Sequence, residues 1–96
     1  MPLAFEWNPH KAELNLKKHA LSFAEAASVF SDPLASIFAD EAHSATERRE
    51  IIIGHCSAKR LVLVCFTEVA KDRIRIISAR RVTRREQRDY EKHLTS

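Results

Sequence analysis

Residues 74–88 read IRIISARRVTRREQR, a strand-like alternation that passes into the start of a helix. Thr83 and Glu86 have the Ser/Thr-x-x-Glu spacing of a capping box, which predicts that a helix begins just after Thr83. Four arginines, at positions 80, 81, 84 and 85, surround this helix start. Because a helix N-terminus carries partial positive charge, so many cations cost stability there unless an anion binds, and a phosphate would fit.

The strand at 73–79 completes a predicted antiparallel meander with strands at 49–56 and 61–67, which are rich in Ile and Val and joined by short turns. Alternation along the last strand predicts one core face and one face that carries cations toward the arginine cluster. The two sets are Arg73, Arg75 and Ile77 on the cationic face, and Ile74, Ile76 and Ser78 on the core face.

The first half of the chain predicts two helices. Asn8 and Pro9 supply an N-cap and a first helical residue for a helix that runs to about Ala20. A second capping box, Ser22 with Glu25, opens a short helix. The remaining predictions are an edge strand at 3–7, a strand at 34–39, a polar loop at 40–46 and a last helix at 84–94. We therefore expect one α+β domain over residues 1–96, with helices packed on one face of a four-stranded antiparallel sheet and a C-terminal helix.

The composition is ordinary for a soluble globular domain, but the charge is unevenly distributed. The net charge is +3 over 96 residues. Residues 71–96 hold nine Lys and Arg against four Asp and Glu, whereas residues 1–70 hold seven against nine. This split favours a polyanionic or acidic partner, and a merely solvated arginine-rich face is an equal alternative. The apolar runs are too short for a membrane span and signal-peptide features are missing, so we expect a cytoplasmic protein without membrane contact.

The two cysteines and five histidines predict neither a disulfide nor a metal site. A two-residue turn at Ala58 and Lys59 would place Cys65 opposite Ile52, which separates Cys65 from Cys56 by more than about 10 Å along the strands. We expect two core thiols. No His or Cys pair has metal-ligand spacing, and no glycine-rich loop is present, so we expect no metal and no cofactor.

The residues that remain fit acid–base chemistry on a phosphodiester. Cleavage of RNA by its own 2′-OH requires proton transfer and cations that hold the charge of the phosphorane, and it requires no metal. Arg80, Arg81 and Arg84 are the candidate cations, and His19 and Glu68 are the candidates for proton transfer. For each there is a structural alternative: His19 complements a helix C-terminus, and Glu68 pairs with a nearby Lys71 or Arg73.

Several blocks of the sequence resemble the BrnT toxin family, and together they run from about residue 4 to 92. They are Phe5–Pro9, Asn15–His19, Ser22–Phe23 with Ala26, 30–33, Arg48 with Ile53–Gly54, Phe66–Glu68, and 73–81 with Thr83–Glu86 and Tyr90. The family usually has Gly where this chain has Ala20, and Asp where it has Asn8. The second exchange keeps the helix cap.

The resemblance implies a RelE-like fold and a metal-independent endoribonuclease toxin that inhibits translation. It also implies neutralisation by a BrnA-like antitoxin with a ribbon-helix-helix domain, and contact with operator DNA only through that complex. Arg80 would then act on the RNA substrate with His19 and Glu68, and the residues that bind RNA would be Lys18, Arg48, Arg81, Arg84 and Arg85. The alternatives are a non-catalytic nucleic-acid-binding module and a basic surface for docking the antitoxin.

Overall fold

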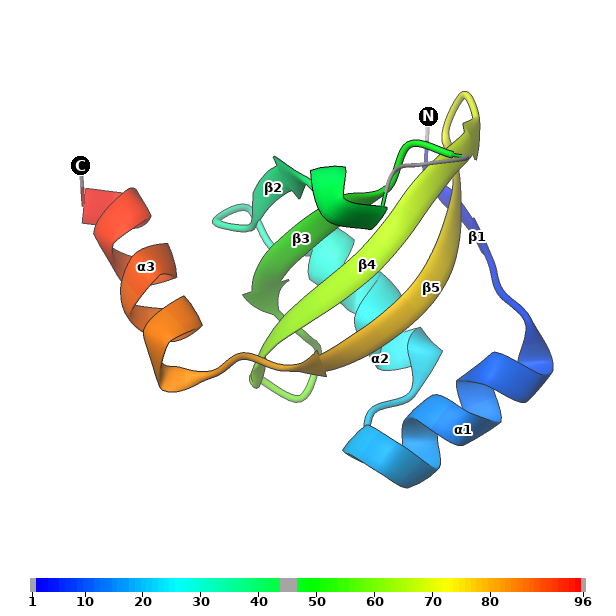
Figure 1. Cartoon of the computed structure of the whole chain (residues 1–96), viewed down its shortest axis with the longest axis horizontal. Coiled ribbons are helices and arrows are strands. Elements are labelled where there is room, and N and C mark those ends of the chain that lie inside the picture. Colours follow the sequence, from blue (N-terminus) through cyan, green and yellow to red (C-terminus); the bar gives the residue numbers. More distant parts are fainter. Residues whose placement is uncertain (1, 44–46, 96) are drawn as a thin grey trace.

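The computed structural model describes residues 2–43 and 47–95, and Figure 1 shows their arrangement. The strands are β1 (Ala4–Glu6), β2 (Ser36–Ala39), β3 (Glu50–His55), β4 (Leu61–Ala70) and β5 (Arg73–Arg81). The α-helices are α1 (Pro9–His19), α2 (Phe23–Ser28) and α3 (Arg84–Thr95), and short 3-10 turns are η1 (Val29–Ser31) and η2 (Glu41–His43). The predicted polar loop at 40–46 thus contains η2, and its residues 44–46 lie outside the described residues.

The strands form one mixed sheet in the order β1-β5-β4-β3-β2. The prediction of four antiparallel strands is wrong, because β1 joins the sheet and runs parallel to β5, with Phe5 opposite Ile74. The other neighbours are antiparallel, as expected for the meander. Pairing between residues almost seventy positions apart leaves no local pattern in the sequence. The edge strand could therefore be predicted, but its pairing with β5 could not.

The hairpin between β3 and β4 is one residue out of the predicted register. Cys65 lies opposite Ile51 rather than Ile52. The loop is longer than two residues: the Cys56 N–H donates to the Arg60 carbonyl at 3.0 Å, and Lys59 takes a positive φ of 62°. Both cysteines are free, as predicted, and Cys65 is only partly buried.

Helix α2 covers one face of the sheet and closes the main core, whereas α1 lies beside the β5 edge and adds only the partly buried Ala12 to it (Figure 1). The members of the main core are Leu21, Phe23, Ala26, Val29, Ile52, Cys56, Val62, Val64, Phe66, Ile74, Ile76 and Ala79. Helix α3 lies against the opposite face, where Tyr90 packs with Ile53 and Leu63 in a second, smaller core. The helices therefore occupy both faces, and α3 has a single large apolar anchor.

One extra residue in β5 changes which arginines share a face. The pairing passes from Cys65 opposite Ser78 to Phe66 opposite Ile76, which leaves Ile77 as a β-bulge. Arg75 and Arg80 consequently point to the same face although they are five positions apart. Ser78, predicted on the core face, joins them. None of the described helices is long and apolar enough to cross a membrane.

Candidate nucleic-acid interface

The face of the sheet opposite the main core carries three adjoining hollows that all include Ile77. Their volumes are about 380, 330 and 300 Å³. We call the three together the Ile77 groove. Its basic side chains come from α1, from β5 and from the segment before β3, and they are Lys11, Lys18, His19, Arg49, Arg75 and Arg80.

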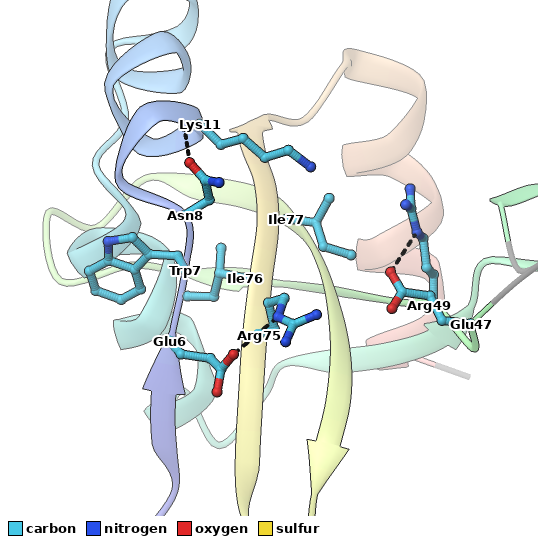
Figure 2. Close-up of a pocket in the computed structure, with 9 residues that line it drawn as sticks. All are labelled: Glu6, Trp7, Asn8, Lys11, Glu47, Arg49, Arg75, Ile76 and Ile77. Atoms are coloured by element: carbon cyan, nitrogen blue, oxygen red, sulfur yellow. Dashed lines mark hydrogen bonds and ion pairs between the residues drawn. The ribbon is translucent and has the colours of Figure 1, made fainter.

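Figure 2 shows one end of the Ile77 groove, where Lys11, Arg49 and Arg75 point toward the space around Ile77 from three different elements. The Trp7 ring points away from these cations and packs edge-on against Phe23, with ring centroids 6.0 Å apart. This end of the groove is therefore defined by charge rather than by an aromatic surface.

Carboxylates hold the arginines of the groove in place. Arg75 Nε lies 3.1 Å from a carboxylate oxygen of Glu6, and Arg49 Nε lies 3.6 Å from one of Glu47. Lys11 and Lys18 form no ion pair with the residues that the structure describes. These pairs order the arginine side chains and offset part of their charge, so the two lysines contribute most to the groove's net positive charge.

Arg80 is the most tightly held of these cations. Its Nη1 and Nη2 atoms each donate to one carboxylate oxygen of Glu86 at 2.8 Å, and Nη1 also donates to the Arg81 carbonyl at 3.2 Å. The hydrogen bonds from Arg80 lower the pKa of Glu86 to about 2, and the same pairing raises the pKa of Arg80. The anion expected to meet the arginine cluster is, for Arg80, supplied by the chain itself.

The predicted capping box at the start of α3 is present. Thr83 N–H donates to Glu86 Oε1 at 2.8 Å, and the Glu86 N–H donates to Thr83 Oγ1 at 3.1 Å. One carboxylate therefore caps α3 and binds Arg80, which links the helix start to the end of β5.

Asn15 places the end of α1 beside β5. Its side chain is buried, donates to the Leu21 carbonyl at 3.0 Å and accepts from the Ala79 N–H at 3.1 Å. His19 follows one turn later and shares the hollow of Lys18 and Ser78. Because Ala79 directly precedes Arg80, this contact fixes the position of His19 relative to that arginine.

The sequence profile of the family described as "Ribonuclease toxin, BrnT, of type II toxin-antitoxin system" matches residues 7–86. The chain belongs to the BrnT family. The crystal structure of the Brucella abortus ribonuclease toxin BrnT, at 1.1 Å resolution, is similar to it with 25% sequence identity and a TM-score of 0.66. That match covers 85% of this chain and 99% of the Brucella chain. No curated protein sequence matches the chain.

Not every predicted residue of this BrnT-family chain reaches the Ile77 groove. Glu68 lies opposite Ile74 on the face of the main core and lines a different hollow, so the structure does not bring it to His19. Arg81 lies opposite Val62 and points to that same face. The sequence patterns could not predict the faces on which Arg80 and Arg81 lie, because the bulge at Ile77 determines which of the two arginines points toward the groove.

The remaining predicted arginines are not among the residues that line the Ile77 groove. Arg48 is exposed, and its carbonyl accepts a hydrogen bond from Thr67 Oγ1 at 2.7 Å. Its neighbour Arg49, which is not among the residues predicted from the sequence, lines the groove. Arg84 and Arg85 are exposed on the first turn of α3.

Lys11 was also missed, although the sequence contains a usable signal. It precedes Lys18 by two helical turns, so both lysines project from one face of α1. Within residues 2–43 and 47–95, no three His, Cys, Asp or Glu side chains are grouped so that they could hold a metal ion.

Proposed function

We propose that this chain is an endoribonuclease toxin that cleaves RNA without a metal and thereby inhibits translation, on a RelE-like fold. The observation that carries the proposal is the Ile77 groove. It gathers basic side chains from three elements on one open face of the sheet, with His19 on α1 and Arg80 on β5. An open groove of this kind suits a single RNA strand, whose phosphates pass several cations in turn.

In the proposed chemistry the 2′-oxygen attacks the phosphorus and loses its proton, while the bond from the phosphorus to the 5′-oxygen breaks and the leaving 5′-oxygen receives a proton, which gives a 2′,3′-cyclic phosphate and a 5′-OH. His19 exchanges a proton with the reacting oxygens, and Arg80 stabilises the negative charge that develops on the phosphorane. Lys11, Lys18 and Arg75 bind neighbouring phosphates. The predicted role of Glu68 as the partner of His19 has no support from its placement on the other face.

We propose further that a BrnA-like antitoxin with a ribbon-helix-helix domain neutralises the toxin in the cytoplasm. Operator DNA would be contacted only through that complex, which represses its own operon. The family description supports an antitoxin partner. Arg84, Arg85 and Arg88 are exposed on α3 and offer charge complementarity to an acidic antitoxin segment.

The decisive experiment is cleavage of RNA by the purified chain in EDTA, with Arg80→Ala beside it. We expect wild-type protein to cut and Arg80→Ala to lose about a hundredfold or more in rate, because the charge of the phosphorane is left unbalanced. Lys71→Ala, which removes an exposed cation from the turn between β4 and β5, should cut like wild type. A strict requirement for added divalent metal would overturn the proposed mechanism.

A non-catalytic RNA-binding module is the second candidate, because carboxylates already neutralise part of the groove's charge. Such a protein would bind RNA with strong salt dependence, would leave it intact, and would not stop growth when expressed. Inducible expression of wild type and Arg80→Ala, with sequencing of RNA 5′ ends, separates the two functions.

A further inference from the structure

The Arg80 guanidinium has N–H groups that make no hydrogen bond to the described residues. A guanidinium carries five N–H donors in a rigid plane. In this chain both Nη1 hydrogens are used, one by Glu86 and one by the Arg81 carbonyl, and one Nη2 hydrogen is used by Glu86. The Nε hydrogen and the second Nη2 hydrogen have no partner among the described residues.

The two unused hydrogens lie side by side. In a guanidinium, Nη1 is on the side of Cδ and Nη2 is on the side of the Nε hydrogen. Glu86 occupies the edge between Nη1 and Nη2, and the Arg81 carbonyl occupies the outer side of Nη1. The Nε–Nη2 edge therefore remains as a complete fork, which is the geometry that binds two oxygens of a phosphate.

We infer that Glu86 is a positioning residue, which holds the Arg80 guanidinium so that its Nε–Nη2 edge binds the scissile phosphate of RNA. The inference rests on the proposed function, since it assigns the ligand of that edge as an RNA phosphodiester. Arg80 lines the hollow of about 330 Å³ together with Arg49 and Ser78, so a phosphate in this part of the groove has a second cation nearby.

Glu86 is suited to hold Arg80 without competing with the phosphate. Its carboxylate receives three hydrogen bonds, two from Arg80 and one from the Thr83 N–H. These bonds fix the carboxylate to the first turn of α3, and they engage a different edge of the guanidinium from the unused one. A phosphate can therefore bind while the Arg80–Glu86 pair stays intact, and it meets an arginine whose rotamer is already ordered.

The test compares Glu86→Gln with Glu91→Gln, which removes the same charge from an exposed position on the same helix. Glutamine keeps the capping box but cannot form the doubly charged fork with Arg80. We expect Glu86→Gln to lower kcat for RNA cleavage about tenfold to a hundredfold, while KM changes by less than about threefold. Glu91→Gln should match wild type in both constants.

Glu86→Asp supplies the second variant, because it keeps the charge and shortens the side chain. If Glu86 acts through position, kcat should fall for Glu86→Asp as well. Wild-type kcat in both Glu86 variants would overturn the inference, and wild-type kcat in Glu86→Asp alone would replace positioning by a simple charge effect. An equal loss of kcat in Glu91→Gln would also overturn the inference that Glu86 positions Arg80.

A measurement that needs no activity keeps this inference separate from the proposed function. In nitrogen-15 NMR of the wild-type protein, rotation of the Arg80 Nη groups should be slow, and Glu86→Gln should make it fast. Fast rotation in the wild type would contradict the positioning role even if the protein cleaves RNA. Slow rotation in a protein that does not cleave would leave the geometry standing and remove the proposed function.

Discussion

Ala20 ends α1 in the left-handed region, with φ 55° and ψ 35°, and its N–H donates to the Leu16 carbonyl. This conformation is the common end of a helix and favours glycine, because a Cβ is crowded there. The resemblance to the BrnT family had already marked the position, since that family usually has glycine in place of Ala20. A local departure from a family pattern can therefore be interpreted physically from the sequence alone.

We expect Ala20→Gly to stabilise the protein by about 1 kcal/mol, since it removes the crowding of the left-handed residue. The measurement is the urea unfolding free energy. Ala12→Gly within α1 is the matched control and should destabilise by a similar amount. Loss of stability in Ala20→Gly would show that the chain does not end α1 in this conformation.

Asn15 is the residue on which the packing of α1 against β5 depends. We expect Asn15→Ala to destabilise the protein by about 1–3 kcal/mol, because the Ala79 N–H and the Leu21 carbonyl would lose their partner in a buried place. Urea unfolding again gives the value. A loss below about 0.5 kcal/mol would mean that other groups satisfy both backbone atoms.

At the scale of whole elements, the helix starts could be predicted and the sheet could be predicted only in part. The capping residues of α2 and α3 form short-range patterns, and both capping boxes are present. The pairing of β1 with β5 and the bulge at Ile77 depend on neighbouring strands that lie far away along the chain. The loop between β3 and β4 is local, but its five residues are not distinguished from a two-residue turn by the alternation of the strands. The alternation of apolar and polar residues does not reveal the extra residue that forms the bulge at Ile77.

The Arg80–Glu86 ion pair, which links β5 to α3, predicts that the free energy of unfolding falls at acidic pH. Glu86 has a pKa of about 2, below its ordinary 4.5, so the stability that it contributes is complete above pH 4.5 and is lost as the pH falls toward 2. We expect wild type to be more stable than Glu86→Gln near neutral pH, and the difference to shrink between pH 4.5 and 2. Urea unfolding at several pH values measures it.

Glu91→Gln is the control over the same pH range, since Glu91 forms no ion pair with the residues that the structure describes. Its difference from wild type should vary less than that of Glu86→Gln. An Arg80–Glu86 pair that contributes nothing would instead give Glu86→Gln and wild type the same unfolding free energy at every pH.

For the molecule as a whole, the Ile77 groove was only partly predictable. His19, Lys18 and Arg80 were selected from the sequence and reach the groove. Lys11 shares α1 with Lys18 and His19 but was not selected, and Arg49 comes from the segment before β3 and meets them only in the folded chain. Charge clustering along the sequence pointed to residues 80–85, whereas the fold spreads the cations over three elements and sends Arg81 to the other face.

The spread of cations predicts how RNA binding responds to salt. Each phosphate contact of a single strand contributes about 0.7 to the slope of log K against log salt. We expect Lys11→Ala and Lys18→Ala each to reduce the slope by about that amount, measured with an RNA whose 2′-OH groups are blocked. Lys71→Ala should leave the slope unchanged. Equal slopes for all three variants would place the RNA elsewhere.

The bulge at Ile77 also restricts the length of β5. Arg75 and Arg80 share the open face only because one residue between them has no opposite residue in β4. A single residue inserted after Ser78 would move Arg80 to the position that Arg81 now holds opposite Val62, on the other face of the sheet and away from the Ile77 groove. We infer that substitutions along this strand are tolerated more readily than a change in its residue count, because the count determines on which side of the sheet each arginine lies.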